Sequence, residues 1–96
     1  MMTAYWIAHV TVTDPLAYAA YQALAPAAFA THGARFLARG GTSEVLEGQS
    51  LTRHVIIEFP SLAAAKACYD SPEYQAARKA RSGAAIVSVV IVEGIA

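Results

Sequence analysis

The sequence predicts an α+β fold, in which four antiparallel strands form one sheet and carry two helices on one face. Extended segments and alanine-rich helical segments follow one another in the order βαββαβ. Because crossover connections are right-handed, both βαβ units place their helices on the same side of the sheet. The chain of 96 residues, 56% of them apolar, is too short for two independent cores, so one domain covers residues 1–96.

The first half of the chain predicts a strand followed by a long helix. Residues 5–12, YWIAHVTV, are rich in β-branched and aromatic residues, which favours a strand. Asp14 is a suitable N-cap, and Pro15 suits the first helical position. Apolar residues then recur at helical spacing as far as Gly33, which suits a left-handed helix end. Pro26 lies inside this helix and is expected to kink or interrupt it.

The middle of the chain predicts two extended strands. The segment ARFLARGG leads into TSEVLEG, so we interpret Gly40-Gly41 as a bulge or kink within one long strand. The residues from Gly48 to Leu51 then form the hairpin loop. The next strand, TRHVIIEF, ends before Pro60.

The last part of the chain predicts a bent helix and a final strand. Ser61 caps the first helical piece, and the Ser-Pro-Glu sequence at 71–73 repeats the start signal after a bend near Asp70. The second piece ends near Arg81. The final segment, AIVSVVIVEG, is continuously apolar, which is typical of a strand buried on both faces. With this strand the element order matches the ferredoxin-like arrangement.

Composition excludes several classes of partner. Seven basic residues balance seven acidic ones, and only 15% of residues are charged, so no basic patch would attract a nucleic acid. The sequence shows no signal-peptide pattern and no apolar stretch of membrane-spanning length. Cys68 has no second cysteine with which to form a disulfide or a thiolate zinc site. We therefore expect a cytoplasmic protein without nucleic-acid or membrane partners, in which Cys68 is a small buried side chain.

Period-two alternation assigns each strand residue to one face of the sheet. Those assigned to the helix side are Trp6, Ala8, Val10, Val12, Phe36, Ala38, Val55, Ile57 and Phe59. Those left for the uncovered side are Tyr5, Ile7, His9, Thr11, Arg35, Leu37, Arg39, His54, Ile56 and Glu58. The uncovered side is half apolar, and the mean hydropathy of +0.39 is high for so short a chain. We therefore expect a second copy to cover it in a homodimer.

A pattern of short motifs extends over nearly the whole chain. The segments YWIAHVTVTDP, RFLARGG, EVLEG, VIIEFPS and YDSPEYQ, with a following arginine, occur in this order. In these motifs the sequence resembles the family known as domain of unknown function 1330, within the dimeric α/β-barrel superfamily. The resemblance implies a homodimer in which two sheets pack face to face into a barrel. Relatives in that superfamily include cofactor-independent monooxygenases, muconolactone isomerases and haem-binding enzymes, but none of their catalytic residues has a matching motif here.

Two histidines and a glutamate on the uncovered side are candidates for chemistry. Because the first and third strands are central neighbours, we expect His9 and Glu58 to lie close together, with Glu58 orienting His9 as a general base. With His54 they also supply the residue types of a metal site with two histidines and one carboxylate, although we predict no bound metal or cofactor. The structural alternative is a polar pair that satisfies itself at the dimer interface.

Two groups of arginines are candidates for binding an anion. Arg35 and Arg39 share one strand face and suit a carboxylate or phosphate group, or else they pair with nearby acids. Tyr74, Arg78 and Arg81 lie at positions i, i+4 and i+7 of one helix face and suit an anionic ligand. The alternative is that Tyr74 anchors the bent helix while the arginines extend into solvent.

Three hypotheses for the function follow. The first is a homodimer that binds a small anionic or aromatic metabolite, either between sheet and helices or between subunits. The second is a cofactor-independent isomerase or monooxygenase that uses His9 as its base, with Glu58 behind it. The third is a structural or interaction module without a ligand.

Overall fold

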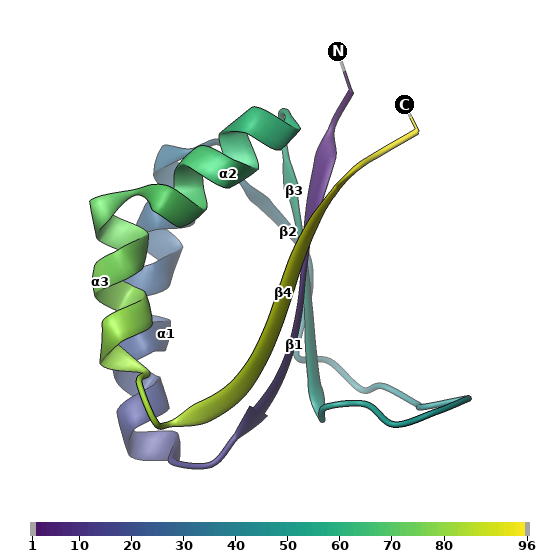
Figure 1. Ribbon diagram of the computed structural model, residues 1–96, viewed down its shortest axis with the longest axis vertical. Helices are drawn as coiled ribbons and strands as arrows, with labels where there is room; N and C mark the ends of the chain where they lie inside the picture. The colour runs from purple at the N-terminus through teal and green to yellow at the C-terminus, as the bar shows by residue number, and fades with distance from the viewer. Residues whose placement is uncertain (1, 96) are drawn as a thin grey trace.

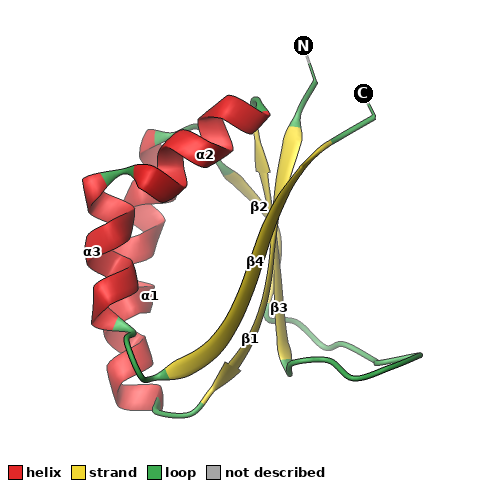
Figure 2. Cartoon of the chain, in the orientation of Figure 1, coloured by secondary structure: helices red, strands yellow, loops and turns green. Residues whose placement is uncertain are grey.

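The computed structural model describes residues 2–95, and it confirms the predicted α+β, ferredoxin-like fold. Met1 and Ala96, which the predicted domain includes, lie outside the described residues. The elements are β1 (Ala4–Val12), α1 (Pro15–Thr31), β2 (Arg35–Arg39), β3 (Arg53–Phe59), α2 (Leu62–Asp70), α3 (Pro72–Ala80) and β4 (Ala85–Glu93). The strands form one antiparallel sheet in the order β2-β3-β1-β4. All three helices lie on the same side of this sheet (Figure 1; Figure 2).

Polar side chains fix the helix starts where the sequence predicts them. The carboxylate of Asp14 accepts from the third residue of α1, and Ser61 does the same for α2. Ser71 links α2 to α3, because its hydroxyl donates to the Cys68 carbonyl (2.7 Å) and accepts from the Tyr74 amide (3.2 Å). One buried serine therefore ends one helix and begins the next, which confirms the predicted bend.

The expected interruption at Pro26 does not occur. α1 continues through this residue as one helix of 17 residues. Proline removes a single backbone donor, while the buried side chains on both sides of it, Ala25, Ala28 and Phe29, pack against the core. This packing holds the helix together across the missing hydrogen bond.

The expected long strand through Gly40-Gly41 is wrong. β2 ends at Arg39, Gly40 takes a left-handed conformation (φ 65°), and the strand does not resume before Arg53. The predicted hairpin loop is therefore part of a longer exposed connection, residues 40–52, which projects away from the helices (Figure 1). The irregularity in the strand lies instead at Leu37, where the β2–β3 register shifts.

The core is an aromatic cluster between the sheet and the helices. Trp6 is 1% exposed and lies edge-on to Phe29 and Tyr74, with ring centroids 5.1 and 5.0 Å apart. It also stacks on Phe59. Tyr74 is fully buried, and its hydroxyl lies 2.9 Å from that of Tyr21. These contacts join β1, β3, α1 and α3 into one core.

No helix covers the other side of the sheet among residues 2–95 (Figure 1). β4 is an edge strand, and Ile86, Val90 and Val92 on it are about half exposed. The expectation that this strand is buried on both faces is therefore wrong for the single chain. In the described part of the chain, no helix is both long enough and apolar enough to cross a membrane.

Candidate ligand-binding site

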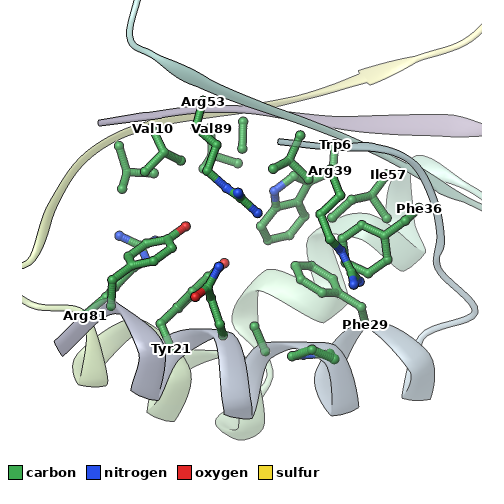
Figure 3. Close-up of a pocket in the computed structure, with 17 residues that line it drawn as sticks. Trp6, Val10, Tyr21, Phe29, Phe36, Arg39, Arg53, Ile57, Arg81 and Val89 are labelled. Atoms are coloured by element: carbon green, nitrogen blue, oxygen red, sulfur yellow. The ribbon is translucent and has the colours of Figure 1, made fainter. Parts of the chain in front are cut away.

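A cavity of about 110 Å³ lies between α1 and the helix side of the sheet (Figure 3). Its walls are largely aromatic and aliphatic, and Trp6, Phe29, Phe36 and Ile57 all contribute to them. Two tyrosines and a glutamine of α1 supply neutral polar groups. The cavity therefore combines an apolar interior with a few convergent polar side chains, as small-molecule sites do.

Three arginines line this cavity, and each comes from a different part of the fold. Arg39 belongs to β2, Arg53 begins β3, and Arg81 follows α3. None of the described aspartates and glutamates lines it. Since the whole chain has no net charge, this excess of cations is a local property of the cavity. Such an arrangement attracts and stabilises an anion.

Arg53 is the best-placed of the three cations. Its side chain leaves the sheet and points into the space above α1 (Figure 3). Its Nε is buried and has no hydrogen-bond partner within residues 2–95. A Cβ at Gly40 would clash with the Nη1 of Arg53, so glycine at that position leaves room for the guanidinium as well as permitting the positive φ.

Arg39 lies on the helix side of the sheet, which corrects the expectation that it lies on the uncovered side. The bulge at Leu37 reverses the alternation, so Ala38 pairs with Ile56 and Arg39 pairs with Val55. The assignment of Ala38 to the helix side is wrong for the same reason. The guanidinium of Arg39 lies 3.5 Å from the centre of the Phe36 ring, a cation–π contact.

Arg35 keeps its expected place on the uncovered side, where its guanidinium contacts the Glu58 carboxylate at 3.3 Å. Arg35 and Arg39 therefore lie on opposite sides of the sheet and do not form one anion site. The pair with Glu58 is a surface ion pair, because the Arg35 side chain is largely exposed.

Arg81 belongs to a hydrogen-bonded network with two tyrosines. Its Nη2 donates to the Tyr74 hydroxyl at 3.3 Å, and its guanidinium lies 4.9 Å from the centre of the Tyr21 ring. Burial raises the pKa of Tyr21 far above its usual value, and the neighbouring Tyr74 adds to the shift. Burial alone would lower the pKa of Arg81, but its hydrogen bond to Tyr74 reverses the direction. At neutral pH the network therefore holds the neutral phenol of Tyr21 beside the charged guanidinium of Arg81.

The predicted grouping of Tyr74 with Arg78 does not form at the cavity. Tyr74 is a core residue, and Arg78 lies beside the Tyr69 ring with its Nη1 donating to the Gln75 side chain. Arg78 and Arg81, with Lys66, line a second, more polar hollow of about 310 Å³ beside β4. Among the predicted residues Tyr74, Arg78 and Arg81, only Arg81 lines both cavities.

The structure does not bring His9 and Glu58 together. His9 lies directly opposite His54, and their Nδ1 atoms are 2.8 Å apart, so one ring donates to the other. Glu58 lies opposite Tyr5, four residues further along, which is about 13 Å on a strand. No group of three metal-ligating side chains occurs within residues 2–95. Both histidines occupy the uncovered side, opposite the face that lines the cavity.

Sequence reasoning missed Arg53, Gly40 and Tyr21 as residues of the site. The position of Arg53 could have been found in the sequence. It lies two residues before Val55 on the same strand, so period-two alternation assigns it to the helix side of β3. The role of Gly40 depends on where β2 ends, which no local pattern showed.

Cys68 is a buried structural side chain, as predicted. It is 0% exposed, and its Sγ donates weakly to the Ala28 carbonyl at 3.7 Å. Burial raises the pKa of its thiol to about 11, and the nearby Glu73 adds to the shift. The thiol therefore stays protonated at neutral pH.

We expect the free energy of unfolding to fall as the pH rises above about 9. The pKa of Cys68 is 9.0 in the absence of burial and about 11 in the folded protein, so the unfolded chain loses its thiol proton first. The stabilisation from the protonated thiol of Cys68 is fully present below the pKa of the unfolded chain. It is lost as the pH rises through the pKa of the folded protein. Tyr21 acts in the same direction above its usual value of 10.0. Urea denaturation at about pH 7.5, 9 and 10.5 measures this.

The Cys68→Ala variant is the control for this measurement. It should lose stability less steeply between about pH 9 and 10 than the parent chain, because it lacks the thiol whose unfolded pKa of 9.0 begins that loss. A denaturation midpoint that stays constant up to about pH 10.5 in the parent chain would contradict the burial of these groups.

Comparisons with known proteins show what this chain is similar to. The family model described as "Domain of unknown function (DUF1330)" matches residues 3–95. A protein of unknown function from Rhodopseudomonas palustris is 22% identical with a TM-score of 0.79, and the alignment covers 99% of this chain and 84% of that one. No curated protein matches the sequence significantly.

Two further solved structures share the fold at lower identity. SnoaB, a cofactor-independent oxygenase from Streptomyces nogalater, is 12% identical with a TM-score of 0.64, over 100% of this chain and 96% of that one. A dimeric protein of unknown function and ferredoxin-like fold from Bacteroides fragilis is 16% identical with a TM-score of 0.64, over 96% of both chains. At such identities the likeness shows the fold alone.

Proposed function

This chain belongs to the family described as domain of unknown function (DUF1330), and from that premise we propose that it is a homodimer that binds a small anionic or aromatic metabolite. The metabolite occupies the cavity between α1 and the helix side of the sheet. One observation carries the proposal: three guanidinium groups converge on an aromatic-walled cavity that no described carboxylate lines.

The uncovered side of the sheet supports the homodimer. Ile86, Val90 and Val92 expose aliphatic surface there, next to the central residue Ile7. The 40–52 connection projects on the same side, and Leu46 on it is 84% exposed (Figure 1). A second copy docked on this face would bury both regions. The dimeric protein from Bacteroides fragilis, which has the same fold, is consistent with this assembly.

We expect a subset of small acids to raise the melting temperature of the protein in a saturable way. Ligand at about 100 times its Kd adds about 2.7 kcal/mol to the free energy of unfolding, which raises the melting temperature by several degrees. The measurement is a thermal-shift titration against small aromatic and aliphatic acids, amides and amines.

His9→Ala is the matched control for this titration. His9 lies on the opposite side of the sheet from the cavity, so the variant should keep the ligand-induced shift. If no compound in the set stabilises the protein, the binding proposal is wrong and the structural module is favoured.

The enzymatic alternative places its chemistry elsewhere in the molecule. A base at His9 would act on a substrate held at the uncovered side, beside His54, and could not reach a molecule in the cavity. The fold that this chain shares with SnoaB, a cofactor-independent oxygenase, is the observation that supports this alternative. Loss of turnover in His9→Ala, with unchanged ligand-induced stabilisation, would support it.

A further inference from the structure

We infer that the ligand is a single-ring aromatic carboxylate, held in the cavity by a two-point interaction of its carboxylate with Arg53. This inference rests on the proposed binding function and narrows it to one class of molecule. It follows from the state of the three cavity arginines, the absence of an internal acid beside them, and the size of the apolar space.

Only one of the three arginines has a free buried donor. Arg39 stacks on Phe36, and Arg81 is engaged by Tyr74 and Tyr21. Arg53 has a buried Nε without a partner among the described residues. A buried donor left in this state is destabilising, and a carboxylate that accepts from Nε and a terminal nitrogen together would satisfy it.

The carboxylate has to come from outside the chain. Glu58 contacts Arg35 on the other side of the sheet, and Asp70 pairs with Lys66 on the surface at 2.8 Å. None of the described aspartates and glutamates lines the cavity. Arg53 therefore has no internal counter-ion within reach, and an anionic ligand supplies it.

The size and the walls of the cavity favour one aromatic ring. An engineered apolar cavity of about 150 Å³ in another protein holds benzene, so the space of about 110 Å³ found here accommodates one ring at most. Trp6, Phe29 and Phe36 provide ring faces and edges for it (Figure 3). A fused two-ring body exceeds this space.

The apolar walls also favour a single negative charge. A phosphate monoester needs several donors around its oxygens, whereas here the unpartnered buried donor is the Nε of Arg53, with the Tyr18 hydroxyl beside the same side chain. Burial raises the pKa of Tyr18 although the charges of Arg53 and Arg81 oppose the shift, so this phenol remains a neutral hydrogen-bonding group. One carboxylate matches this set of groups.

The test measures the affinity of the full chain for benzoate and its analogues. Benzamide keeps the shape without the charge, 1-naphthoate adds a ring, and phenyl phosphate changes the anion. Trp6 is the only tryptophan and lines the cavity, so its fluorescence reports occupancy, with calorimetry as the second readout. We expect benzoate to bind at least about tenfold more tightly than each of the other three compounds.

Arg53→Gln should weaken benzoate binding roughly 100-fold and leave benzamide binding nearly unchanged. Arg35→Gln is the matched control, because it removes a guanidinium on the opposite side of the sheet and should change benzoate affinity less than about twofold. If Arg53→Gln does not fold, Arg53→Lys keeps the charge but loses the two-point geometry, and it should weaken benzoate at least about tenfold.

The outcomes separate this inference from the proposed function. Equal binding of benzoate and benzamide, or an affinity for benzoate that neither Arg53 variant changes, overturns the inference and leaves the binding function standing. Tighter binding of 1-naphthoate or of phenyl phosphate than of benzoate overturns it as well. If neither these four compounds nor any in the broader set binds, the proposed function itself is wrong.

Discussion

We expect the parent chain to be a dimer and the Ile7→Asp variant to be a monomer of 10.1 kDa. Ile7 is the central residue of the uncovered side, opposite Ile56 on β3 and Val90 on β4. In the proposed dimer, symmetry would place the substitution twice in one interface, and each copy would bury an unpaired carboxylate among aliphatic side chains. The dimer dissociation constant should rise roughly 1,000-fold or more, which corresponds to about 4 kcal/mol. Sedimentation at micromolar concentration measures the change.

Leu16→Asp is the control for this prediction. Leu16 is a large aliphatic residue of α1 that is 89% exposed, so the same charge placed there should leave the dimer intact. The circular dichroism spectrum of Ile7→Asp should still show the parent fold, because the substitution touches the uncovered side and not the aromatic core. A parent chain that sediments as a monomer would contradict the dimer itself.

Local signals in the sequence were sufficient for most of the fold. Capping residues such as Asp14 and Ser71 act on the backbone within three residues, so their effect can be predicted without the tertiary structure. The alternation of buried and half-buried side chains on β1 could be predicted in the same way, because a regular strand keeps its period of two. The buried Trp6 and the half-buried His9 lie on the two sides that this period assigns to them.

The errors began where the backbone departs from regularity. The bulge at Leu37 carries no glycine or proline, since it results from how β2 pairs with β3. A single inserted residue moved Arg39 from the uncovered side to the cavity. Gly40, interpreted as the bulge, instead ends the strand with a positive φ.

Register decided the chemistry of the uncovered side. The sequence showed that β1 and β3 are neighbours, but the pairing of individual residues depends on the long 40–52 connection, which has no regular turn geometry. As a result His9 meets His54, and Glu58 lies at the other end of the strand. The position of Arg53 could be predicted from alternation, whereas its partnerless Nε is a property of three-dimensional packing.

Trp6→Ala should have the largest effect on stability of any substitution considered. The side chain is 1% exposed and touches aromatic rings from both strands and helices, among them Phe29 and Tyr74 at about 5 Å. Truncating a buried tryptophan removes its transfer free energy and leaves a cavity, which together cost about 3–5 kcal/mol. Domains of this size have roughly 5–15 kcal/mol in total, so a large part of the stability would be lost.

Trp6→Phe distinguishes the loss of volume from the loss of the indole. It keeps an aromatic ring in the cluster and should lose about 1–2 kcal/mol, less than the alanine variant loses. Urea denaturation followed by far-ultraviolet circular dichroism suits both variants, because neither retains the tryptophan signal. Similar midpoints for the alanine variant and the parent chain would show that Trp6 does not organise the core. In that case the wall of the cavity above Phe29 would not be fixed, and the predicted selectivity for a single ring would lose its structural basis.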